Sequence, residues 1–238
     1  HQRESSLMKT LHSIYTLLLT VLIVSSAGAQ SVPDSIYFQR LYHSCKVWGY
    51  VKYFHTAMEN CEIDWDSVLI AKLPQIQSEP TNQGFKDILL DMVMAPGEMG
   101  SPAGPPPNIP DSLFFNLHLD WFNDTALSPA IHDALDTIRV RFRPQNNCYV
   151  SPSPGTNQPN FDDDIAYNNT GQYPDTERRL LALFRYWNAI EYFFPYTDIM
   201  DLEWDTTLVQ MIPYFYEAQN ADEYAHAVMR LAHHINDT

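Results

Sequence analysis

Apolar side chains recur every three or four residues in several stretches of the chain, which is the period of one buried face of an α-helix. The pattern is most regular over 176–194, where it includes Leu180, Leu183 and Trp187. Pro195 then ends the helix, because proline cannot continue the hydrogen-bond ladder. We therefore predict a mainly α-helical protein. The expected helices cover 36–55, 81–94, 176–194 and 220–235, and two more begin near Asp64 and Glu203.

The chain contains an internal repeat at a constant offset, without a gap, in which Arg179 matches Arg40. Two tryptophan pairs and two aromatic pairs match in register, which chance seldom produces. We interpret the repeat as a duplicated unit of three helices. The matches are Arg40-Leu41 with Arg179-Leu180, Lys46-Val47-Trp48 with Arg185-Tyr186-Trp187, Tyr53-Phe54 with Tyr192-Phe193, Trp65-Asp66 with Trp204-Asp205, Leu69 with Leu208, Pro74 with Pro213, and Phe85 with Tyr224.

Residues 96–175 have a different composition and are expected to join the two units as an irregular segment with little β-structure. Six prolines and three glycines fall within 96–110, which indicates a loop or linker. We expect a short strand over Leu113–Leu119, a helix over Ser128–Ile138 and a strand edge at Tyr149-Val150. Helical units are thus predicted at 36–95 and 176–238.

Residues 1–29 are predicted to hold a secretory signal peptide that starts at Met8. Lys9 provides the positive start, Leu17–Val24 is apolar, and Ala27-Gly28-Ala29 is a small-residue cleavage site. The apolar run is too short to cross about 30 Å of hydrocarbon, so a membrane anchor is disfavoured. We expect an exported protein that is periplasmic, in the cell envelope or extracellular.

Charge and glycine content exclude some functions. The chain has 14 Lys+Arg against 29 Asp+Glu, a formal charge of −15, which repels nucleic acid and anionic membrane surfaces. It has only 8 glycines and no glycine-rich phosphate loop. We predict no cofactor, no nucleic-acid partner and no membrane insertion after signal cleavage.

The three cysteines cannot all pair with one another. A Cys45–Cys61 bridge is conceivable in an oxidising compartment. The favoured interpretation is that Cys45, Cys61 and Cys148 are all small buried residues without a bridge.

No residue of the 238 is assigned a catalytic, cofactor-binding or metal-ligating role. Asp162-Asp163-Asp164 lacks the ligand spacing of a calcium loop and is interpreted as a solvated turn. His233 and His234 point in different directions on a helix, so they suit one metal poorly. His43 and His55 are single helical histidines. The four repeat tryptophans, which could form a sugar-stacking platform, are interpreted as core residues. Sequons stand at Asn123, Asn168 and Asn236.

The aromatic repeat resembles a known family. The stretch from Arg179 to Tyr196, followed by Glu203-Trp204-Asp205, is similar to the helical region before the catalytic core of carboxy-terminal processing (tail-specific) and tricorn-core serine peptidases. Lys46 to His55 resembles the first helical unit of the same family, and the likeness covers about 36–238.

This resemblance implies that the chain is the non-catalytic front of an exported serine endopeptidase. In the family an Asp-[Ser/Thr]-His motif closes the helical bundle, and Asp237-Thr238 match its start. A PDZ-like module and the Ser/Lys or Ser/His core would follow, so peptide substrates would reach this protein through that core. The alternative is a free-standing binding or scaffold module of the cell envelope without enzymatic activity. Whether the protein is an enzyme stays open at this point.

Overall fold

The computed structural model describes residues 32–60, 62–100, 117–142, 147–156, 158–162, 164 and 173–235. Within these residues the protein is mainly helical, as predicted, with seven α-helices and one two-stranded sheet. The α-helices are α2 (Asp34–Phe54), α3 (Trp65–Ser78), α4 (Asn82–Met94), α5 (Pro129–Arg141), α6 (Thr176–Phe193), α7 (Trp204–Glu217) and α8 (Ala221–His233). Strands β1 (Ser151–Pro152) and β2 (Pro159–Asn160) pair antiparallel. Short 3-10 helices η1 (Thr56–Glu59), η3 (Asp120–Asn123) and η4 (Thr197–Ile199) lie between them.

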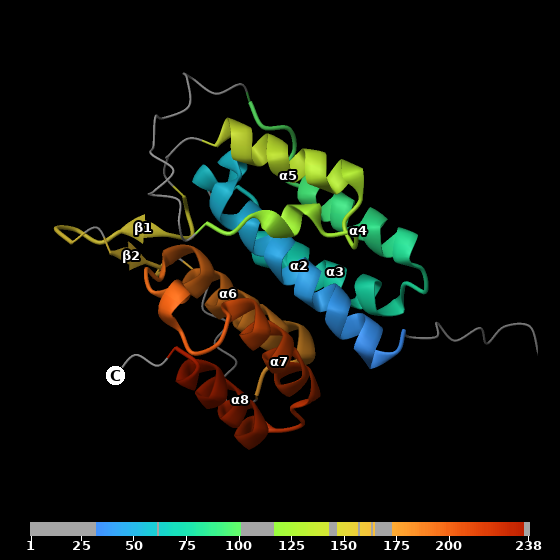
Figure 1. Cartoon of the computed structure of the whole chain (residues 1–238), viewed down its shortest axis with the longest axis vertical. Coiled ribbons are helices and arrows are strands. Elements are labelled where there is room, and N and C mark those ends of the chain that lie inside the picture. The colour runs from blue at the N-terminus through green and yellow to red at the C-terminus, as the bar shows by residue number, and fades with distance from the viewer. Residues whose placement is uncertain are drawn as a thin grey trace, which may run out of the picture. The chain divides into compact units, whose positions relative to one another are not determined.

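Helices α2, α3 and α4 form a first set, and α6, α7 and α8 form a second set beside it (Figure 1). Helices α3 and α7 begin and end at matched positions of the repeat, and so do α4 and α8. The last residue of α6 likewise matches the last residue of α2. Gln77 at the end of α3 donates a hydrogen bond to Tyr216 Oη of α7, and these matched residues are 139 residues apart. The offset read from the sequence is therefore also the offset of the helices.

Capping side chains mark several helix starts that the sequence indicates. Asp64 Oδ1 accepts a hydrogen bond from Ser67 N at the start of α3, and Asn220 caps α8 in the same manner. Ser128 caps α5, and a proline occupies the first turn of that helix. Each cap satisfies a backbone N–H that has no partner inside its helix.

Within each set, two tryptophans hold the first helix against the second. Trp48 Nε1 donates to Trp65 O at 3.0 Å, and Trp65 Nε1 donates back to Trp48 O at 2.9 Å. Trp187 and Trp204 make the same reciprocal pair, both bonds at 2.9 Å. All four rings are buried, which confirms the core role over a sugar-stacking platform. The indole N–H groups are satisfied although the rings lie in the core.

The repeated arginines bind the end of the second helix in each set. Arg40 Nη1 donates to Ile76 O at 3.2 Å, and Arg179 Nε donates to Phe215 O at 2.8 Å. The two acceptors are also matched positions of the repeat. A buried guanidinium at this place satisfies carbonyls that the helix leaves without partners and interacts favourably with the negative end of the helix dipole.

The two sets meet at equivalent positions. Asn188 lies opposite Gly49, its counterpart in the repeat, and a Cβ built on Gly49 would lie 1.8 Å from Asn188 Oδ1. Asn188 Nδ2 donates to the carbonyl oxygens of Cys45 (3.1 Å) and Phe184 (2.9 Å), which are counterparts as well. Contacts between equivalent positions are what an approximate twofold axis between two similar sets produces.

The structure corrects three expectations and leaves others untested. Residues 117–119 form no strand, and 113–116 lie outside the described residues. The strand edge expected at Tyr149-Val150 is displaced to β1, although Val150 forms an isolated bridge with Asn147. Cys45 is a free buried thiol, as favoured, but Cys148 is disulfide-bonded. Cys61 and the signal peptide over 1–29 lie outside the described residues.

No helix among the described residues is long and apolar enough to cross a membrane.

The close approach of α2 to α6 generates a stability prediction. Gly49→Ala forces its methyl group into Asn188 and is expected to lower the free energy of unfolding by about 3 kcal/mol. Urea denaturation measures the loss. Adding Asn188→Ala to the Gly49→Ala protein should restore part of the lost stability, because it removes the side chain that the new methyl group contacts. Gly100→Ala is the control, because nothing lies within 4 Å of its added Cβ. Equal stability of the Gly49→Ala and Gly100→Ala proteins would contradict the close approach.

Candidate functional site

Two ion pairs connect the two helix sets, and in each pair a basic residue of one set binds an aspartate of the other. Lys46 of α2 binds Asp205 of α7, with its Nζ 2.7 Å from Oδ1 and 2.8 Å from Oδ2. Arg185 of α6 binds Asp66 of α3 in return. Lys46 and Arg185 are counterparts in the repeat, as are Asp66 and Asp205. Each aspartate lies in the first turn of its helix, where the helix dipole also favours negative charge.

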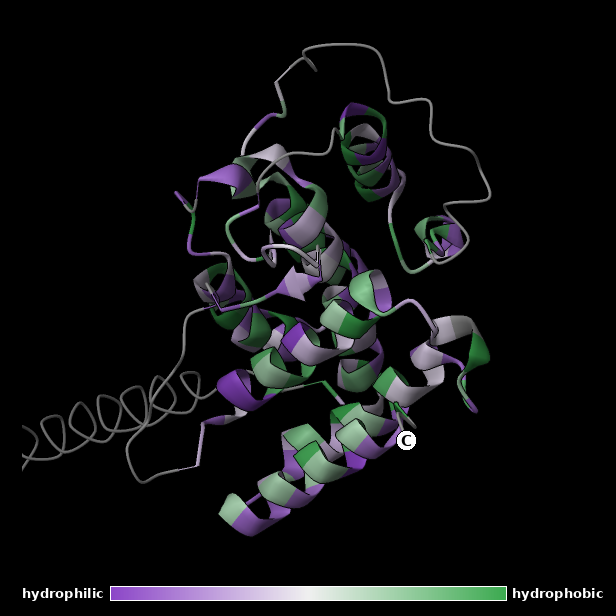
Figure 2. Cartoon of the chain, turned by 90° about the vertical axis from the view of Figure 1, so that its left-hand side faces the viewer, coloured by the Kyte–Doolittle hydropathy of each residue, from purple (hydrophilic) through white to green (hydrophobic). Residues whose placement is uncertain are grey.

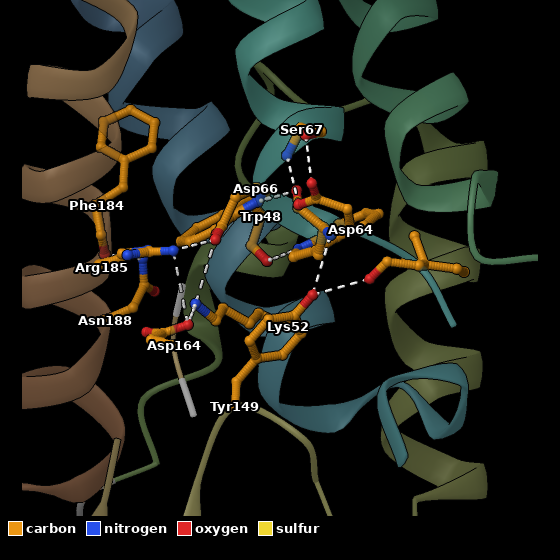
Figure 3. Close-up of polar contacts among 12 residues, drawn as sticks. Trp48, Lys52, Asp64, Asp66, Ser67, Tyr149, Asp164, Phe184, Arg185 and Asn188 are labelled. Atoms are coloured by element: carbon orange, nitrogen blue, oxygen red, sulfur yellow. Dashed lines mark hydrogen bonds and ion pairs between the residues drawn. The ribbon is translucent and has the colours of Figure 1, made fainter. Parts of the chain in front are cut away.

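The first charge cluster forms around Asp66, and each of its charged side chains has an ion-pair partner within it. It consists of Lys52, Asp66, Asp164 and Arg185 (Figure 3). Lys52 Nζ lies 2.7 Å from Asp164 Oδ1 and 3.6 Å from Asp66 Oδ1. The side chains of Lys52 and Asp66 are fully buried. Asp164 comes from the connecting segment and lies 112 residues from Lys52 in the chain.

Aromatic rings enclose the ammonium group of Lys52. Its Nζ lies 4.9 Å from the ring centre of Trp48 and 4.4 Å from that of Tyr149. Burial lowers the pKa of Lys52, and the carboxylates of Asp66 and Asp164 oppose this effect. Among the described residues the cluster has two acidic and two basic side chains, whose charges balance. Burying several charged groups costs less free energy when each has a partner of opposite charge.

The second charge cluster forms around Asp205 and borders an open cavity. It consists of Lys46, Glu191 and Asp205. Glu191 is the counterpart of Lys52, so an acid stands here where the first cluster has a base. The cavity has a volume of about 520 Å³. Its lining residues are Lys46, His118, Asp120, Trp121, Glu191, Thr197, Met200, Leu202, Glu203, Trp204 and Asp205.

Glu191 is the most perturbed carboxyl group of this cluster. Burial raises its pKa to about 7; Lys46 opposes the rise and Asp205 adds to it. Only 7% of the residue is exposed, and among the described residues it makes no hydrogen bond or ion pair. A carboxyl group in this situation changes its charge near neutral pH.

Most of the candidate site residues named from the sequence have structural roles. Asp164 is not part of a solvated turn, because it closes the first cluster; Asp162 is exposed and Asp163 lies outside the described residues. His55 Nδ1 accepts from Ala57 N at the start of η1. His43 Nδ1 lies 4.0 Å from Asp124.

The candidate metal ligands and glycosylation sites lie partly within the described residues. Among the described residues no group of three or more His, Cys, Asp or Glu side chains is placed to hold a metal, and this holds at His233 and His234. Of the sequon asparagines, Asn123 is exposed, while Asn168 and Asn236 lie outside the described part of the chain, as do Asp237 and Thr238.

Local sequence patterns do not indicate the two clusters, although the repeat contains a signal for them. Lys46 and Asp66 both have a counterpart of the same charge in the repeat. A basic and an acidic position repeated at one offset could have indicated an exchange between the units. The change from Lys52 to Glu191 at matched positions was a second such signal.

Comparisons with protein-family models, with curated proteins and with solved structures find no match to this chain.

The pKa of Glu191 generates a prediction about stability and pH. The folded pKa of about 7 lies above the reference value of 4.5, so the folded state holds this proton more tightly than the unfolded chain does. Stability from this group is present below pH 4.5 and is lost as the pH rises to about 7. Glu191→Gln removes the cost of the buried charge and should stabilise the protein at pH 8 by about 2 kcal/mol relative to its effect at pH 4.

Urea denaturation at both pH values measures this difference. Glu62→Gln, which removes an exposed carboxyl group, is the control. A Glu191→Gln protein whose stability relative to the unsubstituted chain is the same at pH 4 and pH 8 would contradict the raised pKa.

Proposed function

We propose that this chain is the non-catalytic helical region of an exported serine endopeptidase and packs on the catalytic core that follows it. The proposal draws on the resemblance to the tail-specific and tricorn-core peptidases. We further infer that its two helix sets descend from one duplicated three-helix unit. Proteolysis would then be carried out by a Ser/Lys or Ser/His core, and this region would support that core or limit access to it.

The observation that supports the proposal best is an uncovered apolar face on α8. In the first set, α5 packs on α4, and Leu89 and Val93 are buried. The counterpart of Leu89 in the second set is Val228, which is 42% exposed against 0% for Leu89. Ala232, the counterpart of Val93, is exposed too. No described helix covers α8 as α5 covers α4 (Figure 1).

Neighbouring residues extend this face. Met229 of α8 and Val209 and Tyr214 of α7 are exposed, and a hollow of about 600 Å³ lies between the two helices beside Met229 and Tyr214. Figure 2 shows hydrophobic residues along the helices at its lower end, where α8 lies. Exposed apolar patches of this kind are typical of surfaces that bind another polypeptide.

The tryptophan motif supports an architectural role. The family resemblance depends on residues that hold helices together, among them Trp48, Trp187 and Trp204. A region whose distinctive motif is structural suits an accessory part of an enzyme. The alternative, a free-standing envelope module, is favoured by the same α8 face if the face binds a separate protein.

The experiment is to read the gene beyond codon 238 and to mix the polypeptide encoded there with this chain. We expect a His codon, then a PDZ-like and a protease region, and a complex by size-exclusion chromatography. Val228→Glu should weaken that complex by about tenfold, because a charge would replace an exposed apolar contact. Val140→Glu on α5 is the matched control, since Val140 is also exposed.

A stop codon directly after codon 238, together with binding of a separate envelope protein, would favour the free-standing module. Peptide hydrolysis by the purified chain alone would contradict a non-catalytic role.

A further inference from the structure

The two charge clusters occupy equivalent positions but differ in the sign of one buried residue. Lys52 stands in the first cluster, and Glu191 stands at the matched position of the second. The other two matched positions keep their signs, with one aspartate and one basic residue in each cluster. Comparing the charged residues of the second cluster with those of the first therefore shows which charge the second cluster lacks.

The balance of charge differs accordingly. In the first cluster the positive charges of Lys52 and Arg185 face the negative charges of Asp66 and Asp164. In the second, Lys46 and Asp205 already form a pair, ionised Glu191 adds one negative charge, and Asp120 and Glu203 line the same cavity. A positive charge brought into the cavity would therefore reduce an excess of negative charge.

Two hydrogen-bond acceptors at the cavity are left without partners among the described residues. Glu191, more than nine-tenths buried, makes no hydrogen bond or ion pair with them. Thr197 Oγ1, which can accept a hydrogen bond, is buried without a partner there. Both residues line the same cavity. Because buried polar groups are almost always satisfied, two acceptors that converge on one open space indicate that a hydrogen-bond donor of a ligand completes them.

The first cluster also indicates the chemical class of that ligand. There an ammonium group lies 3.6 Å from a first-turn aspartate, 4.9 Å from the ring centre of Trp48 and 4.4 Å from that of Tyr149. The cavity of the second cluster has Asp205 and Glu191 among its acidic lining residues, and Trp121 and Trp204 are its aromatic ones. Acidic groups combined with aromatic faces favour organic cations, which gain both ion pairing and cation–π attraction.

We propose that the cavity bordered by Glu191, Asp205 and Trp204 binds an organic cation, namely a primary ammonium or guanidinium group on a short aliphatic arm. The cation completes the second cluster as Lys52 completes the first, and Met200 and Leu202 provide apolar contact for the arm. The proposal does not rest on the peptidase assignment and applies equally to a free-standing module.

Isothermal titration calorimetry at pH 8 and low salt tests the proposal on the purified protein. The probes are n-butylammonium and N-butylguanidinium, with butan-1-ol as the neutral isostere and butyrate as the anion. The cations should bind at least about tenfold more tightly than either comparison compound. A blocked tripeptide with a central lysine, compared with its glutamine analogue, distinguishes the source of the cation. Tighter binding of the lysine peptide than of butylammonium identifies a basic side chain, and the reverse identifies a free amine.

Three variants connect binding to the cluster. Glu191→Gln should lower the affinity for butylammonium about tenfold or more, because it removes the unbalanced charge. Glu191→Lys places an ammonium group of the protein's own at the position matched to Lys52 and should abolish binding. Glu62→Gln is the matched control and should bind as the unsubstituted protein does. Circular dichroism and thermal melting establish that each variant is folded.

The proposal is overturned if butan-1-ol or butyrate binds as tightly as the cations, or if no cation binds at saturating concentration. It is also overturned if folded Glu191→Gln binds butylammonium unchanged, or if calcium chloride binds where the amines do not.

Discussion

Two ion pairs join the helix sets. In each pair a basic residue of one set neutralises an aspartate of the other set. Lys46 reaches Asp205 across the interface, and Arg185 reaches Asp66. Both aspartates lie in first turns whose position depends on the reciprocal tryptophan pairs within each set. The exchange requires α2 and α6 to approach closely, and Gly49 makes that approach possible.

The approximate twofold relation makes the differences between the clusters informative. One matched position holds Lys52 in the first cluster and Glu191 in the second. The connecting segment sends Asp164 into the first cluster, whereas the second opens to a cavity. The described charges of the first cluster balance one another, whereas those of the second border a cavity. The exposed apolar residues of α8, which no described helix covers as α5 covers α4, are a separate feature of the second set.

Local patterns predicted the helices well, because apolar period, capping residues and prolines act over a few residues. The internal repeat also predicted the matched helices and the buried tryptophans. Asp164 was misjudged because its partner Lys52 lies 112 residues away, and no local pattern reports such a contact. Glu191 was missed because helical spacing places it on a helix but does not reveal that the neighbouring space is open. The disulfide at Cys148 likewise depends on tertiary geometry.

The most direct measurement is a crystal structure of the protein grown at pH 8 with N-butylguanidinium. The account predicts the guanidinium group between the carboxylates of Glu191 and Asp205, beside the ring of Trp204, with the Lys46–Asp205 pair retained. A cavity that holds only water under these conditions, or an anion bound at Lys46, would contradict the account.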